Sequence, residues 1–425
     1  MANTSPRVPR KNATVYVARD IERAFGMDPS PMYRIVTNRS PYAESIQGLF
    51  PAYVSLVDGQ LDTIDLLKHK AAEPKDDEAV LVFKNTSAIE EFCASKGWVL
   101  LNPAAALAER IENKISQVEY LGPIGEKYFP AHIVAPLKEI LWKAEPRIIQ
   151  WAHGHTGGGT ILVSTEAELA ALRDKFPERP ARSTAVVLGP SFTVNAIVPA
   201  RGETLVGNIS YQITGLAPFT DAPFATVGND WSATHTILTE QEIESIRAMA
   251  KEIGAKLQSD GWRGLFGIDV MKDATLDKIF LIEINARQPA STTLESRLQA
   301  ENRRHGLKGA TVLESHLDAL RETDALGASG TAKQGAEPKQ SDDAAHLIEI
   351  NDGAQIVQRV TSSVKSVPED VAGSLELAGY TVIAYGNTAP GEDLIRIQSS
   401  RGIIDALGNP NPRCKEIIDS LSDDK

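Results

Sequence analysis

The sequence has few cysteines: its 425 residues include only Cys93 and Cys414. The two lie far apart, and neither belongs to a CxxC pair or to the Cys/His spacing of a zinc site. Scattered single cysteines of this kind are typical of proteins in a reducing compartment. We therefore predict a cytoplasmic protein without structural zinc.

Basic charge and long apolar runs are scarce as well. Lys and Arg number 44 against 56 Asp and Glu, which gives a formal net charge of -12. Nucleic acid and anionic membranes attract basic surfaces, so we expect neither as a partner. No apolar run is long enough to span a bilayer. Residues 1–12 are polar and proline-containing, carry no signal-peptide pattern and are predicted to be disordered.

Two common nucleotide-binding fingerprints are missing too. The first expected strand comprises residues 13–19, and the loop that follows it lacks the motif G-x-G-x-x-G. The motif G-x-x-x-x-G-K-[ST] does not occur either. Residues 79–84 and 98–101 are expected to form strands on either side of a helix at 87–96. The order strand, helix, strand predicts a small parallel sheet that is not a dinucleotide-binding domain.

A glycine-rich turn joins two expected strands in the middle of the chain. This turn, residues 153–159, contains Gly154, Gly157, Gly158 and Gly159. Closely spaced glycines let the backbone approach an anion and direct amide donors towards it, so we interpret the turn as a phosphate lid. It is not a P-loop, because Thr160 begins a strand where that motif needs a lysine and a helix. The alternative is a flexible hairpin tip without a ligand.

The densest cluster of candidate metal ligands lies in two apolar strands joined by a polar turn near Leu276. If the strands pair as a hairpin, Asp269 lies opposite Glu283, and the period of two places Glu283, Asn285 and Arg287 on one face. Oxygen ligands of this kind suit magnesium, which usually binds one or two protein carboxylates together with substrate phosphates. The arrangement therefore predicts a magnesium site beside a nucleoside triphosphate. The alternative is a buried carboxylate paired with Arg287.

Two weaker signals accompany this cluster. Lys114, on an expected helix that opens near residue 102, could be a phosphate- or adenine-side cation, although an isolated lysine on a helix is usually solvated. An apolar strand at 183–188 ends in Val186, Val187 and Leu188, which could present backbone groups to an adenine edge.

These parts, taken in order, make the chain resemble the ATP-grasp superfamily, in the branch of carboxylate-amine ligases and biotin-carboxylase-like enzymes. The resemblance covers roughly residues 13–320. It rests on Lys114 in Glu-Asn-Lys, the glycine turn, Asp269 in Gly-Ile-Asp, and the run from Glu283 to Arg287 in Glu-Ile-Asn-Ala-Arg. The implied fold class is α/β (α+β), with an ATP-grasp fold.

The resemblance also implies roles for single residues. Asp269, Glu283 and Asn285 would bind magnesium, with two ions expected and Mn2+ as a possible substitute. Lys114, Gln150, Val186, Val187, Leu188 and the turn from Gly154 to Thr160 would contact ATP. Arg287 would lie near the transferred group as the catalytic cation. Two departures stand out: Gln150 occupies the place of a nucleotide-binding lysine found in many members, and residues 184–188 lack the acidic residue usual near the adenine.

The implied reaction is ATP-dependent activation of a carboxylate as an acyl phosphate, followed by attack of an amine. The expected partners are therefore a small-molecule acid and a small-molecule amine, and the products are an amide or peptide bond, ADP and phosphate. One alternative is biotin-carboxylase-like carboxylation. A second is an ATP-binding protein without catalysis, against which the intact set of Asp269, Glu283 and Asn285 argues.

Composition shifts divide the chain further. Residues 13–104 are predicted to form a pre-ATP-grasp α/β domain with a parallel sheet, and residues 105–323 the ATP-grasp domain with two subdomains. Residues 324–343 lack apolar rhythm and are expected to be a flexible linker. Residues 344–425 are expected to form a small C-terminal α+β module that shapes the acceptor site or a homodimer contact.

Overall fold

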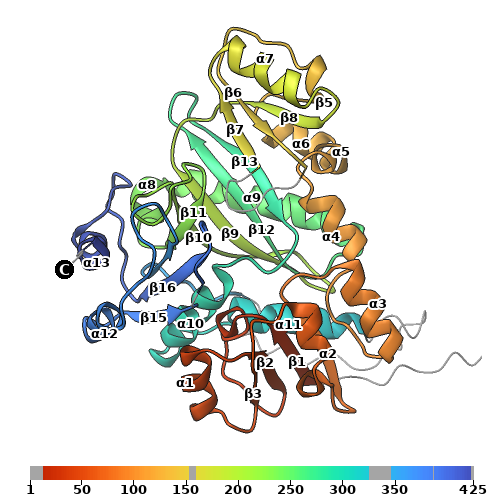
Figure 1. Cartoon of the computed structure of the whole chain (residues 1–425). Helices are drawn as coiled ribbons and strands as arrows, with labels where there is room; N and C mark the ends of the chain where they lie inside the picture. The colour runs from red at the N-terminus through yellow and green to blue at the C-terminus, as the bar shows by residue number, and fades with distance from the viewer. Residues whose placement is uncertain (1–12, 153–158, 325–345, 386, 423–425) are drawn as a thin grey trace, which may run out of the picture.

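The computed structural model describes residues 13–152, 159–324, 346–385 and 387–422. Within these ranges the chain forms a parallel sheet, a small antiparallel sheet and a large antiparallel sheet, each with its own helices (Figure 1). The predicted disordered N-terminus, Gly154, Gly157, Gly158 and nearly all of the predicted linker lie outside the described residues. No helix in the described part of the chain combines the length and the apolar character needed to cross a membrane.

The N-terminal sheet has the order β3-β2-β1-β4, and its neighbouring strands are parallel. Its strands are β1 (Ala13–Ala18), β2 (Tyr33–Asn38), β3 (Val54–Val57) and β4 (Glu78–Val82), and its helices are α1 (Pro41–Leu49), α2 (Thr63–Lys68) and α3 (Ser87–Lys96). Tyr16 is buried in the cluster on one face, and Val15 and Val17 in the cluster on the other. Burial of both faces explains the continuous apolar strands and confirms the predicted parallel sheet.

The segment 98–101, predicted as a strand, forms only an isolated bridge between Leu100 and Val80. The Asn102 side chain then takes over the pairing, since it accepts from the Val82 N at 2.9 Å and donates to the Val82 O at 2.7 Å. Pro103 follows, and it has no N–H group to continue the hydrogen bonding with β4. The predicted strand at 98–101 is therefore limited to the single bridge.

The small sheet has the antiparallel order β5-β8-β6-β7. Its strands are β5 (His132–Pro136), β6 (Arg147–Gln150), β7 (Thr160–Val163) and β8 (Pro180–Ala185), and α7 (Glu166–Lys175) packs beside it. Gln150 pairs with Thr160, as expected for strands that flank the glycine turn. The predicted strand 183–188 instead ends at Ala185, because the chain leaves this sheet to enter β9.

Helices α4 (Ala105–Glu112), α5 (Ser116–Leu121) and α6 (Pro123–Tyr128) connect the first two sheets. Lys114, predicted on a helix, lies instead in the turn between α4 and α5. The cause is Asn113, whose backbone is extended and whose side chain accepts from the N–H groups of Ile115 and Ser116. Such a side-chain turn ends one helix and opens the next.

The large sheet has the antiparallel order β13-β12-β9-β10-β11-β14-β16-β15. Its strands are β9 (Ser191–Val198), β10 (Leu205–Thr214), β11 (Thr226–Asp230), β12 (Gly264–Asp273), β13 (Lys278–Asn285), β14 (Ala354–Arg359), β15 (Thr381–Ala384) and β16 (Asp393–Ser399). The C-terminal strands thus extend the central sheet through the β11–β14 pair. The domain boundaries themselves stay a prediction.

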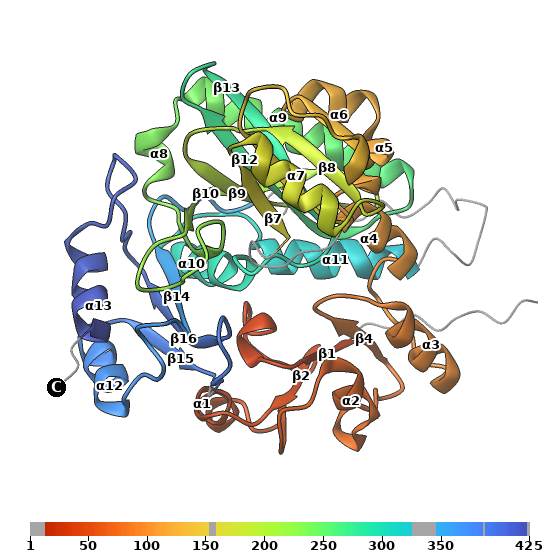
Figure 2. The same ribbon diagram turned by 45° about the horizontal axis from the view of Figure 1, so that its top comes forward.

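The remaining helices are α8 (Thr234–Ile237), α9 (Glu240–Ser259), α10 (Thr292–Arg304), α11 (Val312–Asp324), α12 (Glu369–Leu377) and α13 (Pro412–Ser422). Helix α9 begins with a capping box of Thr239 and Glu242 and buries the predicted apolar face against the large sheet. Helix α11 runs between the N-terminal sheet and the large sheet, as Figure 2 shows, and its apolar residues pack on both.

Candidate active site

The β12–β13 hairpin has the predicted register. Asp269 pairs with Glu283 and Gly267 with Asn285, so these polar side chains come together on adjacent strands. The Asp273 carboxylate accepts from the N–H groups of Thr275 and Leu276 at 2.8 and 2.7 Å, which forms the turn. The register shifts between Asp269 and Val270, which leaves Ile282 of β13 as a bulge residue directly beside Glu283.

Lys114 and Glu283 form an ion pair through Nζ and Oε2. Burial alone would raise the pKa of Glu283, but Lys114, Arg287 and Arg182 hold this pKa below the ordinary value of a glutamate. Glu283 is therefore ionised at neutral pH, as a metal ligand must be.

Asp269 lies in a different environment. Thr193 Oγ1 donates to its Oδ1 at 2.6 Å, and Asn285 Nδ2 donates to its Oδ2 at 3.1 Å. Burial, and then the neighbouring Glu283, raise the pKa of Asp269 to about 6. The two carboxylates repel each other, and a cation placed between them would relieve this repulsion.

Arg287 reaches the same cluster from the end of β13. Its Nη1 donates to Glu112 Oε1 of α4 and to Asn285 Oδ1, each at 2.7 Å. Lys84 also pairs with Glu112, and although burial would raise the pKa of Glu112, Arg287 and Lys84 hold it below the ordinary value. The ion-pair partner of Arg287 is thus Glu112, rather than the Asp269 or Glu283 considered from the sequence.

The donor set fits magnesium better than zinc or calcium. Two carboxylates and one amide oxygen are hard ligands, and three protein oxygens leave room for water and phosphate oxygens. The described residues contain no cluster of three or more His, Cys, Asp or Glu side chains that could hold a metal by themselves. A magnesium ion at Asp269 and Glu283 would therefore need the nucleotide phosphates to complete its shell.

Gln150 has a partner that the sequence analysis missed. Its Oε1 accepts from Arg182 Nε at 2.9 Å and from Arg182 Nη2 at 2.6 Å, across the β6–β8 pair. Arg182 is 2% exposed. A single arginine in the otherwise uncharged strand that ends at Ala185 was the signal that could have identified it, since a buried charge requires a reason.

Val186, Val187 and Leu188 lie in the connection from β8 to β9. The Leu188 carbonyl accepts from the N–H of Ala274 at 2.9 Å, next to the hairpin turn. Gly189 has a φ of 154°, and a β-carbon at this position would lie 2.0 Å from the Lys272 carbonyl oxygen. This contact requires glycine and brings the connection against β12, while the adenine role of these residues stays a prediction.

A row of polar side chains crosses one face of the large sheet from Asp269 outwards. The strand register places these residues side by side on successive strands: Asp269 on β12, Thr193 on β9, Ser210 and Gln212 on β10, Asn229 on β11, Gln355 on β14 and Gln398 on β16. Hydrogen bonds join Gln355 to Asn229 at 3.2 Å and Asn229 to Ser210 at 3.1 Å. Opposed residues in an antiparallel sheet share a face, so this polar row lies on the face of the sheet that carries Asp269, and most of its side chains are buried.

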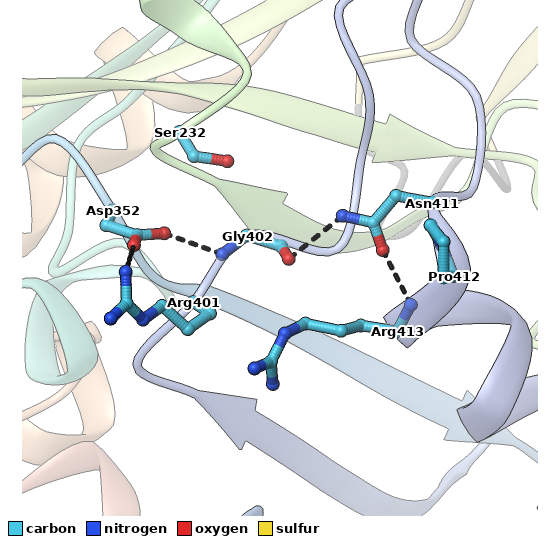
Figure 3. A pocket seen from close by; sticks show the side chains of 7 residues that line it. All are labelled: Ser232, Asp352, Arg401, Gly402, Asn411, Pro412 and Arg413. Atoms are coloured by element: carbon cyan, nitrogen blue, oxygen red, sulfur yellow. Dashed lines mark hydrogen bonds and ion pairs between the residues drawn. The ribbon is translucent and has the colours of Figure 1, made fainter.

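A cavity of about 550 Å³ lies elsewhere, at the beginning of α13. Figure 3 shows its lining residues, among them Asp352, which accepts from Arg401 and from the Gly402 N–H. The residues of the hairpin cluster, namely Lys114, Asp269, Glu283, Asn285 and Arg287, do not belong to its lining. The cavity is therefore separate from the residues of the hairpin cluster.

Solved structures with this fold cover nearly the whole chain. An ADP complex of N5-carboxyaminoimidazole ribonucleotide synthetase (purK) is 15% identical with a TM-score of 0.61, over 98% of both chains. The Aspergillus clavatus N5-carboxyaminoimidazole synthase, in complex with ADP and 5-aminoimidazole ribonucleotide, is 13% identical with a TM-score of 0.61, over 96% of this chain and 99% of that chain. An L-amino acid ligase from Bacillus licheniformis is 13% identical with a TM-score of 0.57, over 98% of both chains.

No protein-family model matches the sequence, and a comparison with curated proteins found no match. Identities this low establish the fold and nothing finer. The likeness confirms the predicted α/β (α+β) class and the ATP-grasp fold.

Proposed function

We propose that this protein is an ATP- and magnesium-dependent ligase that joins a small-molecule carboxylic acid to an amine. The observation that carries the proposal is the pairing of Asp269 with Glu283, with Asn285, Lys114 and Arg287 in contact around them. The ADP and ATP complexes among the structures with this fold support nucleotide binding.

Each group has a distinct part in this proposal. Asp269, Glu283 and Asn285 would hold magnesium, which supplies positive charge to the phosphates when it is bound. Lys114 would exchange its contact with Glu283 for a phosphate oxygen, because the metal then neutralises that carboxylate. The charge that develops on the transferring phosphoryl group is stabilised by fixed cations, so no protein nucleophile is needed.

Arg287 would hold the acid. Its Nη1 is used by Glu112 and Asn285, while Nε and Nη2 have no hydrogen-bond partner among the described residues. A planar guanidinium anchored at one corner can still offer two parallel donors to a carboxylate or an acyl phosphate. The polar row next to Asp269 offers neutral donors and acceptors to the rest of the acid or to the amine.

A second candidate function is ATP-dependent carboxylation of an amine, with bicarbonate as the acid. The likeness in fold to the carboxyaminoimidazole ribonucleotide synthetases favours it. The two candidates share the nucleotide and metal chemistry and differ in the acid that is activated.

Single-turnover ADP release with a panel of acids tests the proposal. Purified protein is mixed with ATP and magnesium and with amino acids, dipeptides or bicarbonate, each with and without an amine. ADP formed only with an organic acid supports the amide ligase, and ADP formed only with bicarbonate supports the carboxylase. Binding of ATP without ADP formation from any acid would favour the non-catalytic alternative.

A further inference from the structure

Arg182 combines complete burial with an unused donor. Its Nε and Nη2 donate to Gln150, and Nη2 also donates to the Ile282 carbonyl at 2.8 Å. Its Nη1 is buried and has no hydrogen-bond partner among the residues that the structure describes. The Phe129 ring lies 5.0 Å from the guanidinium carbon, so the plane of the group is held as well. This arginine is fixed in position while the two N–H donors of its Nη1 are unsatisfied.

The guanidinium of Arg182 also bonds no carboxylate directly among the described residues, although Glu283 is near enough to favour its charged form. Its hydrogen-bond partners are a neutral amide and a neutral carbonyl, and no carboxylate pairs with it in the described part of the chain. Burial lowers the pKa of Arg182 to about 10, and Glu283 acts in the opposite direction. A buried charge and a buried unsatisfied donor are each costly, so such an arrangement is typical of a site that an anion completes.

The location identifies the anion. Arg182 contacts the bulge at Ile282, immediately before Glu283, and its partner Gln150 is the last residue of β6. Lys114 and Arg287 lie at the same carboxylate but already have partners, Glu283 and Glu112. Arg182 thus differs from these two cations in having no ion-pair partner among the described residues, and it lies beside the carboxylates where the phosphates of a nucleotide would bind.

We propose that Arg182 binds the phosphate groups of the nucleotide and that Gln150 positions it for this task. The proposal rests on the proposed ATP-dependent function. It changes the part of Gln150, which was predicted from the sequence to contact ATP itself. The amide oxygen of Gln150 accepts from the Arg182 guanidinium and holds it in place. The positive charge that would bind the phosphates is therefore on β8, the strand beside β6.

Calorimetric titration of the full-length protein with ATP and magnesium tests the proposal. Arg182→Met should weaken ATP binding at least about tenfold, the loss that ~1.4 kcal/mol produces. The matched control is Arg147→Met. Arg147 is also a buried arginine of this sheet, but it bonds Ser183 and lies three residues from Gln150, on the other face. It should leave ATP affinity within about twofold.

Moving the positive charge from residue 182 to residue 150 distinguishes a role of Arg182 in ATP binding from a role in folding. Gln150→Lys combined with Arg182→Met returns a cation to the neighbouring strand, so it should recover much of the ATP affinity lost in Arg182→Met. If Arg182 only supported the fold, both variants would show the same lowered melting temperature and the lysine would restore nothing, which would overturn the proposal. Equal ATP affinity of Arg182→Met and the unaltered protein would also overturn it.

Failure of the proposed function and failure of the Arg182 proposal would give different results. An unaltered protein that does not bind ATP and magnesium at all rejects the proposed function, and the Arg182 proposal with it. An unaltered protein that binds ATP tightly, beside an Arg182→Met variant that binds equally well, rejects only the part of Arg182. If Arg182→Met does not fold, Arg182→Gln provides the same test, because it also removes the charge but keeps a polar side chain at this buried position.

Discussion

Lys114 and Glu283 form an ion pair although 169 residues separate them in the sequence. The contact ties the turn after α4 to the strand that carries the carboxylate pair. It also keeps Glu283 ionised in spite of its burial, which prepares the carboxylate for a metal ion.

Replacing Glu283 by Ala should abolish ADP formation and change the melting temperature little. The carboxylate is the proposed central magnesium ligand, and without it Lys114 loses its partner and the phosphates lose the metal. The measurement is ADP release with the accepted acid, beside a thermal melt. Asn285→Ala should be milder, with an increased magnesium requirement. Near-normal turnover of Glu283→Ala would reject the metal assignment.

Arg287→Lys should bind ATP nearly normally and lose about tenfold or more in turnover with the acid. Lysine keeps the charge and can still reach Glu112, but it lacks the planar fork of donors. About 1.4 kcal/mol of lost transition-state stabilisation is enough for a factor of ten. ATP affinity by calorimetry and ADP release are measured on the same preparation. Equal losses in both would leave Arg287 as a counter-ion of Glu112.

Thr193→Val should raise the magnesium concentration needed for half-maximal ADP formation severalfold. The hydroxyl holds Asp269 at 2.6 Å, and valine has the same shape without the donor. Thr234→Val is the matched control, because Thr234 is also a buried threonine but donates to the Ile209 carbonyl and not to Asp269. Identical magnesium curves for Thr193→Val and the unaltered protein would show that Asp269 does not depend on this bond.

Glu295→Gln should reduce the loss of unfolding free energy that the protein undergoes as the pH rises. Burial raises the pKa of Glu295 from 4.5 to about 7, although Asn195 and Asn208 donate to it. A carboxyl with a raised pKa contributes stability below about pH 4.5 that is lost as the pH rises through about 7. A pKa that rises from 4.5 to about 7 corresponds to about 3 kcal/mol.

Urea unfolding between pH 5 and pH 8 measures this effect. The difference in unfolding free energy between the Gln variant and the unaltered protein should grow in favour of the variant across this range. Parallel pH curves would show that Glu295 has an ordinary pKa in the folded state.

The local pattern of residues was enough to predict the hairpin at the centre of the site. The period of two and the polar turn place Asp269 opposite Glu283, and the structure has this register. The apolar face of α9 and the pairing of Gln150 with Thr160 follow from the same local rules. Each concerns residues close in sequence, for which spacing decides which side chains share a face.

Contacts between distant segments were decided by the tertiary structure. Arg287 pairs with Glu112, 175 residues away, and Arg182 donates to Ile282, 100 residues away. The polar row continues into β14 and β16 because β14 joins the sheet beside β11. Periodicity tells which residues a strand buries, and it does not tell which strand lies next to it. That choice depends on how the whole chain packs its apolar faces, so the partners of buried charges appear only in the folded protein.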